Sequence, residues 1–253
     1  MTPDSFSLEG RVAVVTGANT GLGQGLAVAL AGAGADIVCV GRSPAAETVA
    51  AVQALGRQAL EVQADLTSTR DVPQILAETL GRFGRLDILV NNAGTIRRAD
   101  ALEFSETDWD DVLGVNLKSV FFLSQAAARE MIGSGRGGKI IHIASMLSFQ
   151  GGIRVASYTA SKSGVAGLTR LMANEWAARH VNVNAIAPGY FATNNTEALR
   201  QDETRNRDIL ARIPAARWGQ PGDLAGAAVF LASRASDYVH GAVIPVDGGW
   251  LAR

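Results

Sequence analysis

The sequence predicts a single α/β domain in which parallel strands alternate with helices. Seven short, strand-like runs recur along the 253 residues, and they are nearly continuously apolar rather than alternately apolar and polar. Strands of this kind are buried on both faces, as they are in parallel sheets covered by helices. Because helical patterns fill the gaps between the runs, we predict one doubly wound sheet over residues 1–253.

The expected elements follow in order along the chain. Strands are predicted at 11–16, 36–40, 59–63, 86–90, 139–145, 182–187 and 242–246, and helices at 22–33, 45–56, 69–83, 106–132, 157–178 and 221–232. The polar, charged segment 188–218 interrupts this alternation directly after a strand. Ligands bind at the carboxyl ends of such strands, so we interpret 188–218 as a substrate lid; a plain solvated insertion is the alternative.

Charge and composition favour a small partner. The formal net charge is -1, and the longest basic run is the pair Arg97-Arg98, which argues against a nucleic-acid surface. The single cysteine, Cys39, lies in an apolar run and is interpreted as a core residue. With no secretory signal pattern and no apolar stretch long enough to span a bilayer, a cytoplasmic enzyme without a membrane partner is expected.

A glycine-rich turn follows the first strand. The sequence from Thr16 to Gly23 has the form T-G-x-x-x-G-x-G and precedes an alanine-rich helical pattern. A strand, a glycine turn and a helix in this order place the amino end of the helix against a pyrophosphate. Gly17 would permit the tight turn, Gly21 the approach of the phosphates, and Gly23 the close packing of helix and strand.

Tyr158 and Lys162 stand four residues apart, and Ser145 lies upstream at the end of an apolar run. On a helix the first two side chains would share a face roughly 6 Å apart. A tyrosine hydroxyl ionises near pH ~10, so a catalyst working near neutrality needs a neighbouring positive charge to stabilise its phenolate. We therefore predict a proton-transfer site in which Lys162 lowers the pKa of Tyr158.

Together these motifs resemble the short-chain dehydrogenases/reductases over nearly the whole chain. The resemblance rests on Thr16-Gly17-x3-Gly21-x-Gly23, Asp65-Leu66, Asn91-Asn92-Ala93-Gly94, Asn116, Ser145, Tyr158-x3-Lys162 and Pro188-Gly189. It implies a Rossmann-type sheet of strand order 3-2-1-4-5-6-7 and reversible NAD(P)-dependent oxidation of a secondary alcohol. Further segments, including 145–155 and 192–196, resemble members acting on six-carbon deoxy sugar acids in the breakdown of pectin- or alginate-type uronates.

The resemblance implies a catalytic set of Asn116, Ser145, Tyr158 and Lys162. Tyr158 would exchange the proton of the substrate hydroxyl, and Ser145 would hold and polarise the reacting oxygen. Lys162 would also grip the nicotinamide ribose, and Asn116 would extend a proton relay from Lys162 towards solvent. The alternative is that Asn116 is an ordinary helical asparagine with no role in proton transfer.

The same resemblance implies the cofactor contacts. They are Gly17, Asn19, Thr20, Gly21, Leu22, Gly23, Arg42, Asp65, Leu66, Asn92, Ala93, Gly94, Tyr158, Lys162, Pro188, Gly189 and Thr193. The choice between NAD and NADP stays open. Gly41 stands where an acid would bind the ribose 2'-hydroxyl of NAD, and Arg42 could clamp a 2'-phosphate, so the local chemistry favours NADP while the resembled enzymes are NAD-linked.

A sugar-acid substrate requires a cation for its carboxylate. Arg154, four residues before Tyr158, is the first candidate, and Arg97, Arg98 and Arg217 follow. Sugar hydroxyls are assigned to Gln150, Asn194 and Asn195. His142 is interpreted as a packed histidine, and no metal site is predicted because His180 and His240 lack partners at metal-ligand spacing.

Two other functions remain as alternatives. One is reduction of a 3-oxoacyl carrier-protein thioester, and the other is a dinucleotide-sensing module that has lost its chemistry. The near-neutral charge disfavours the first, and the presence of Ser145, Tyr158 and Lys162 disfavours the second. The resemblance also implies a homotetramer assembled through the helices that carry Asn116 and Tyr158.

Overall fold

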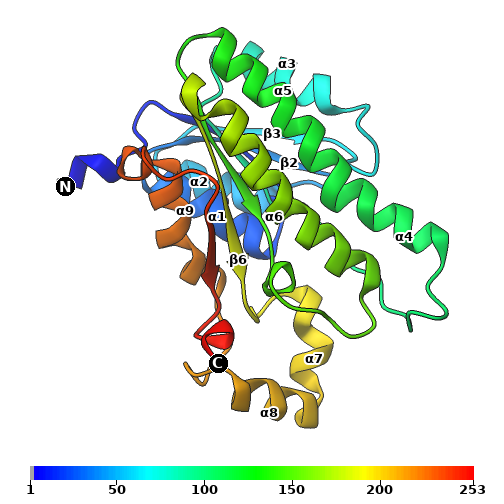
Figure 1. The fold of residues 1–253 in the computed structure, drawn as a ribbon. Helices are drawn as coiled ribbons and strands as arrows, with labels where there is room; N and C mark the ends of the chain where they lie inside the picture. Colours follow the sequence, from blue (N-terminus) through cyan, green and yellow to red (C-terminus); the bar gives the residue numbers. More distant parts are fainter. Residues whose placement is uncertain (1–2) are drawn as a thin grey trace.

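The computed structural model of the protein describes residues 3–253 and contains a seven-stranded parallel sheet of order β3-β2-β1-β4-β5-β6-β7 (Figure 1). The strands are β1 Val12–Thr16, β2 Asp36–Gly41, β3 Ala59–Gln63, β4 Ile88–Asn91, β5 Gly138–Ile143, β6 Val181–Pro188 and β7 Val243–Val246. Each predicted strand is present and the predicted order is confirmed.

Helices connect these strands on both faces of the sheet. They are α1 Gly21–Gly32, α2 Ala46–Ala54, α3 Val72–Phe83, α4 Glu106–Leu113, α5 Ser119–Gly133, α6 Ala156–Trp176, α7 Glu197–Gln201, α8 Glu203–Arg212 and α9 Ala225–Ala232. Short helical turns are η1 Pro3–Phe6, η2 Gly114–Lys118, η3 Met146–Ser148, η4 Ala177–Arg179, η5 Asn194–Thr196, η6 Pro221–Leu224, η7 Arg234–Ser236 and η8 Trp250–Ala252. Among residues 3–253, no helix is both long and apolar enough to cross a membrane.

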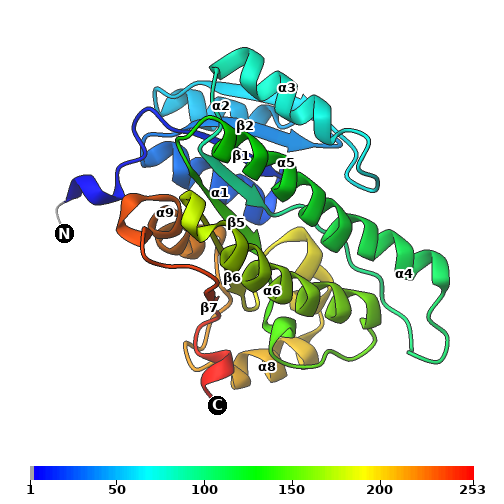
Figure 2. The ribbon, with the colours of Figure 1, turned by 45° about the horizontal axis from the view of Figure 1, so that its top comes forward.

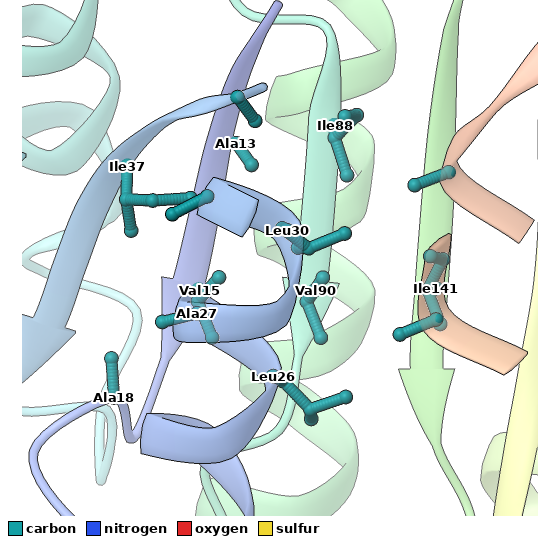
Figure 3. Packing of buried hydrophobic residues seen from close by; sticks show 14 of the residues in the cluster. Ala13, Val15, Ala18, Leu26, Ala27, Leu30, Ile37, Ile88, Val90 and Ile141 are labelled. Carbon is teal, nitrogen blue, oxygen red and sulfur yellow. The ribbon is translucent and has the colours of Figure 1, made fainter. Parts of the chain in front are cut away.

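The core has one apolar layer on each face of the sheet. On one face Leu26 and Leu30 of α1 pack with Val15, Ile37 and Val90, as Figure 3 shows. The second layer lies beneath α3, α5 and α6 (Figure 2). Each fully buried leucine or isoleucine contributes about 1.5–3 kcal/mol relative to exposure, so strands that are apolar on both faces are stable only between two such layers.

Two predicted helices differ in detail from the structure. The pattern at 106–132 forms α4 and α5 with a single π-helical turn, η2, between them. The pattern at 221–232 begins as the turn η6, where Pro221 stands in the first helical positions and cannot donate a backbone hydrogen bond. The segment 188–218 contains α7 and α8, two helices that its polar sequence does not reveal because neither has a buried side chain.

Buried polar groups tie layers of the fold together. His142 of β5 lies 3.1 Å from Ser124 Oγ of α5 through Nε2, and 2.9 Å from Thr169 Oγ1 of α6 through Nδ1. Thr169 donates its hydroxyl to the Val165 carbonyl at 2.7 Å, so it accepts from Nδ1–H of a neutral imidazole. Burial lowers the pKa of His142 to about 3, with the charge of Lys162 as a smaller cause. The prediction of a packed histidine is confirmed.

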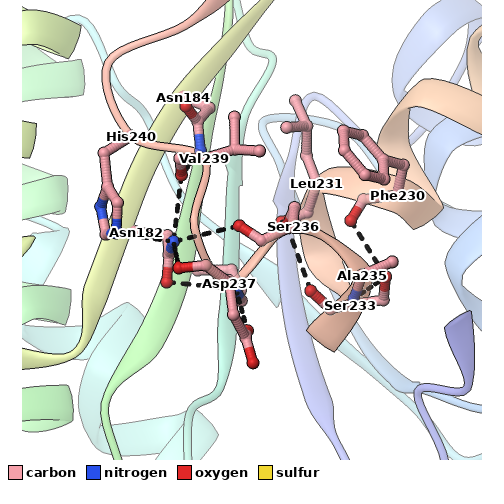
Figure 4. A network of polar contacts seen from close by, with 11 residues as sticks. Asn182, Asn184, Phe230, Leu231, Ser233, Ala235, Ser236, Asp237, Val239 and His240 are labelled. Atoms are coloured by element: carbon pink, nitrogen blue, oxygen red, sulfur yellow. Dashed lines mark hydrogen bonds and ion pairs between the residues drawn. The ribbon is translucent and has the colours of Figure 1, made fainter. Parts of the chain in front are cut away.

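A second polar network secures the edge strand β7. The Asn182 amide donates to the carbonyls of Asp237 and Val239, each at 3.0 Å (Figure 4). Asn184 donates to the Val239 carbonyl at 2.8 Å and accepts from Ala242 N–H at 3.0 Å. These contacts hold the connection between α9 and β7 against the amino-terminal half of β6.

Candidate active site

Ser145, Tyr158 and Lys162 come together at the carboxyl end of β5. Ser145 follows the strand, and the other two occupy the first turns of α6. The Lys162 ammonium lies 5.6 Å from the centre of the Tyr158 ring. A spacing of four residues on one helix face thus produces the predicted proximity.

Ser145 is placed by a local cap. It is 8% exposed and precedes η3, and its Oγ accepts a hydrogen bond from Leu147 N–H at 3.2 Å. This bond uses the hydroxyl as an acceptor, so its proton remains available for another oxygen. A hydrogen bond with Ser145 is among the influences on the Tyr158 phenol.

The Tyr158 phenol experiences opposing influences. Burial is the largest and raises its pKa, while the hydrogen bond with Ser145 and the positive charge of Arg98 lower it; the net pKa is above the ordinary value. We predicted that Lys162 lowers this pKa, but in the structure the lowering comes from the hydrogen bond with Ser145 and, to a smaller extent, from the charge of Arg98.

Lys162 is 5% exposed, and its ammonium donates to the Ile143 carbonyl at 2.6 Å. Burial lowers its pKa to about 8. The ammonium is thereby anchored to the last residue of β5, with further donors left for a ligand.

Asn116 occupies the π-helical turn between α4 and α5 and is fully buried. Its Oδ1 accepts from Thr95 N–H at 2.8 Å, and its Nδ2 donates to the Thr95 carbonyl at 2.9 Å and to Ser161 Oγ at 3.3 Å. The side chain thus connects the loop after β4 to α6. Single π-turns frequently mark functional positions, and the relay role of Asn116 stays a prediction.

The glycine-rich turn has the geometry that its spacing predicts. Gly17 and Gly21 adopt positive φ angles of 64° and 58°, which favour glycine. A Cβ on Gly23 would collide with the Gly17 carbonyl and lie 2.5 Å from Asn92 Nδ2. Thr20 precedes α1 without a side-chain cap, so the N–H groups at this helix end face a position suited to a phosphate.

The turn at 92–94 is joined to the glycine-rich turn. Thr16 Oγ1 accepts from the N–H groups of Asn92 and Ala93 at 3.0 and 2.9 Å. The Asn92 amide donates to the Thr16 carbonyl at 2.8 Å. These hydrogen bonds join the two turns at the carboxyl ends of β1 and β4, where the cofactor contacts are predicted.

Polar groups suited to a ribose lie at the end of β2. Asn19 Nδ2 donates to Ser43 Oγ at 2.8 Å. The exposed Arg42 guanidinium makes no hydrogen bond or ion pair within residues 3–253, although its charge contributes to the lowered pKa of Asp65. A hydrogen bond from Thr67 N–H is the main cause of that lowering. These donors, with the glycine cradle, fit a dinucleotide.

The remaining predicted cofactor contacts lie in the backbone after β6, beside the glycine-rich turn, or against the core. Gly189 N–H donates to Val246 O at 2.9 Å just after Pro188 ends β6. Thr193 lies 3.7 Å from the position of a Cβ on Gly21, beside the glycine-rich turn. Leu66 is buried and Leu22 is half-buried, and both pack against the core, so they would reach a nucleotide through backbone atoms.

The candidate cations for a substrate carboxylate are in different environments. Arg97 is held by Asp108 and Asp111 of α4 at 3.2 and 3.3 Å. Arg154 has a φ of 62° and a side chain that is 61% exposed, 3.8 Å from Asp100. Arg98 is the arginine whose charge acts on Tyr158, and within residues 3–253 no hydrogen bond or ion pair occupies it.

Other predicted substrate contacts also have partners. Gln150 Oε1 accepts from Arg212 Nη2 and Trp250 Nε1, each at 3.4 Å. Arg217 donates twice to Asp223, at 2.7 and 2.8 Å. Asn194 is exposed at the start of η5, and the side chain of Asn195 lies outside the described part of the structure.

Arg212 and Trp250 are residues near the site that sequence reasoning missed. Their contacts with Gln150 join residues that are 62 and 100 positions apart in the sequence, which no local pattern reports. In the sequence, Arg212 lies in a polar segment and Trp250 lies 38 residues further on, and neither position by itself indicates a contact with Gln150.

Comparison with known proteins agrees with this geometry. Residues 11–204 match the short chain dehydrogenase family. The chain is 66% identical to the 2-dehydro-3-deoxy-D-gluconate 5-dehydrogenase of Escherichia coli (strain K12), over all of both chains.

Two solved structures show the same fold. One, from Agrobacterium tumefaciens, is described as a candidate 2-deoxy-D-gluconate 3-dehydrogenase with bound NADP; it is 61% identical, covers 99% of this chain and 100% of its own, and has a TM-score of 0.93. The other is a gluconate 5-dehydrogenase of Burkholderia cenocepacia J2315 in complex with NADP and tartrate, 42% identical with 99% of each chain covered and a TM-score of 0.95. With the serine, tyrosine and lysine assembled at the same edge of the sheet as the glycine-rich turn, the chain belongs to the short chain dehydrogenase family and is an oxidoreductase.

Proposed function

We propose that this protein oxidises a secondary alcohol of a six-carbon deoxy sugar acid to the ketone, and catalyses the reverse reduction. 2-Dehydro-3-deoxy-D-gluconate and 2-deoxy-D-gluconate are the proposed substrates. The observation that carries the proposal is the assembly of Ser145 with Tyr158 and Lys162 at the carboxyl end of β5, and the exposed Arg98, whose charge acts on Tyr158, offers a cation for a carboxylate. The name of the Escherichia coli relative supports the same substrate class.

The proposed chemistry depends on Tyr158 and Ser145. Tyr158 takes the hydroxyl proton during oxidation and returns it during reduction. Ser145 hydrogen-bonds the reacting oxygen, and because its Oγ is held by Leu147 N–H, it does so from a fixed position. Arg98 favours the phenolate electrostatically and pairs with the substrate carboxylate.

The glycine-rich turn and the amino end of α1 would hold the pyrophosphate, and Lys162 the nicotinamide ribose. When bound, the nicotinamide accepts a hydride from the alcohol carbon or returns one to the ketone. The segment 188–218 is proposed as the lid that covers the substrate, because it follows β6 at the ligand-binding edge of the sheet.

We propose that NADP is bound at least as well as NAD. Gly41 places no carboxylate near the ribose, and Arg42, Ser43 and Asn19 offer donors for a 2'-phosphate. The NADP in the Agrobacterium tumefaciens relative supports this choice. In a cell the reaction would belong to the breakdown of pectin- or alginate-type uronates.

We also propose a homotetramer. Phe122 of α5 and Leu171 of α6 are 39% and 45% exposed, and a cavity of about 800 Å³ lined by Leu117, Phe121 and Leu168 opens on the same helices. Light scattering at catalytic concentrations tests this assembly. A monomeric mass would contradict it.

The substrate assignment is tested by measuring oxidation of 2-deoxy-D-gluconate with NAD and with NADP in separate assays. Reduction of a 3-oxoacyl thioester is measured beside it, and the expected result is sugar-acid turnover that clearly exceeds thioester turnover. Thioester reduction without sugar-acid turnover would overturn the proposal. Nucleotide binding without turnover of either substrate would instead indicate a dinucleotide-sensing module.

A further inference from the structure

The last residue of the described chain caps a helix of the proposed lid. Arg253 Nη2 donates to the Ala211 carbonyl at 2.6 Å, and its Nε donates to the Arg212 carbonyl at 3.3 Å. Both carbonyls lie in the last turn of α8, where helical carbonyls lack an intrahelical partner. A positive charge is favourable at this end of a helix. Figures 1 and 2 both show the carboxyl terminus beside α8.

A second contact joins the same helix end to the catalytic loop. The Arg212 guanidinium lies 4.0 Å from the centre of the Trp250 ring, close enough for a cation–π interaction. Arg212 and Trp250 both donate to Gln150 Oε1. Gln150 lies in the loop that begins with Ser145, so one amide oxygen connects the lid, the chain terminus and the catalytic loop.

Apolar packing joins the same segments. Trp250 is 5% exposed and packs in a cluster with Ile213, which follows α8, and Met146, which directly follows Ser145. Tyr190, at the start of the proposed lid, lies 4.8 Å from the Trp250 ring centre. Trp250 therefore packs against Tyr190 near the start of segment 188–218 and against Ile213 in its second half.

We propose that Gln150, Arg212, Trp250 and Arg253 form a C-terminal latch that holds α8 against the catalytic loop and thereby positions the lid for substrate binding. The inference rests on the proposed role of 188–218 as a lid. The latch residues act through the lid, as positioning residues. Loosening the latch leaves Ser145, Tyr158 and the cofactor cradle in place, so it changes KM rather than kcat or nucleotide affinity.

The test uses the full chain with Arg253→Ala, Gln150→Ala and Gln150→Glu. Hydrogen exchange of the amides in α8 is measured without substrate, and KM and kcat for 2-deoxy-D-gluconate are measured with saturating cofactor. We expect Arg253→Ala and Gln150→Ala to accelerate exchange in α8 by about tenfold, which corresponds to ~1.4 kcal/mol. KM rises several-fold, while kcat and NADPH binding change by less than about twofold.

Gln150→Glu tests whether an acceptor oxygen at residue 150 is enough to maintain the latch. A carboxylate still accepts from Arg212 and Trp250, so exchange in α8 is expected to return to the wild-type rate. Arg207→Ala is the matched control and is expected to change neither readout. Arg207 lies on the same helix, and its one ion pair within residues 3–253 is with its neighbour Asp208, at 3.4 Å.

Two results would overturn the latch. One is unchanged exchange in α8 for both Arg253→Ala and Gln150→Ala; if KM nevertheless rises in Gln150→Ala, Gln150 binds substrate directly. The other is faster exchange with an unchanged KM, which would make the contacts merely structural. Because exchange is measured without substrate, absence of sugar-acid turnover in the wild type would count against the proposed function and leave the exchange result to be judged separately.

Discussion

Burial raises the pKa of the Tyr158 phenol on α6, while the hydrogen bond with Ser145 and the positive charge of Arg98, from the loop after β4, act against this rise. Burial is the largest of these influences. A cation at this position can favour the phenolate and attract an anionic substrate at once. Arg98 therefore connects the acidity of the Tyr158 phenol with the binding of an anionic substrate. Substitutions of Tyr158 and of Arg98 test the two roles.

Tyr158→Phe is expected to lower kcat/KM for sugar-acid oxidation by about 10²- to 10⁴-fold, because the proton acceptor is removed. NADPH binding, followed by fluorescence, should change little, since the glycine-rich turn is untouched. Tyr238→Phe is the matched control, because the Tyr238 side chain is fully exposed. Full turnover in Tyr158→Phe would refute the proton-transfer role.

Arg98→Gln is expected to raise KM for 2-deoxy-D-gluconate by about 10- to 100-fold, the usual cost of losing a hydrogen bond to a charged group. Because Arg98 lowers the pKa of Tyr158, its loss should move the rise of the oxidation rate to higher pH. Steady-state kinetics across a pH series measure both effects. Arg154→Gln is measured in parallel, and a large KM effect there with none in Arg98→Gln would show that Arg154 is the carboxylate ligand.

Arg42→Asp is expected to reduce kcat/KM with NADP by about 100-fold or more while activity with NAD is kept, since a carboxylate repels the 2'-phosphate. Coenzyme kinetics with both nucleotides check the change. Arg70→Asp serves as the control, because Arg70 is also exposed and also contributes to the lowered pKa of Asp65. Equal losses in both variants would mean that general charge, and not a phosphate contact, was altered.

His142 is expected to make the fold sensitive to acid. The pKa of His142 is about 3 in the folded protein and near 6.5 in the unfolded chain. Between these two pH values the unfolded chain therefore binds a proton at His142 that the folded protein does not bind. The unfolding free energy should therefore fall by up to about 1.4 kcal/mol per pH unit between these values, and approach ~4–5 kcal/mol of loss at the acid end.

Urea unfolding over this pH range measures that effect, with His142→Gln as the variant that removes the titrating group. The variant should show a shallower loss of stability with acid than the wild type. His180→Asn is the control, because His180 is exposed and its φ of 62° suits asparagine. An unchanged acid profile in His142→Gln would rule out His142 as the source.

The positions of the strands could be predicted because burial on both faces leaves a simple signal. Residues such as Val12 to Val15 and Ile37 to Val40 are apolar without alternation, and only a covered parallel sheet accommodates them. The π-turn at Asn116 could not be predicted, because an extra residue in a helix does not alter the periodicity over so short a length. Helices α7 and α8 were not predicted because neither has a buried side chain that would give an apolar periodicity. The contacts of α8 instead include hydrogen bonds at its carboxyl end.

By itself the sequence determined the parallel sheet, the glycine-rich turn and the pairing of Tyr158 with Lys162, because each follows from patterns within a few residues of one another. Only the tertiary structure decided which arginine acts on the phenol and what holds Gln150. Arg97, Arg98 and Arg154 cannot be distinguished by sequence, because all three are arginines near the predicted site. In the structure Arg97 is paired with Asp108 and Asp111, whereas the charge of Arg98 acts on Tyr158. Such choices depend on the through-space placement of charges from distant segments, a quantity that local spacing does not contain.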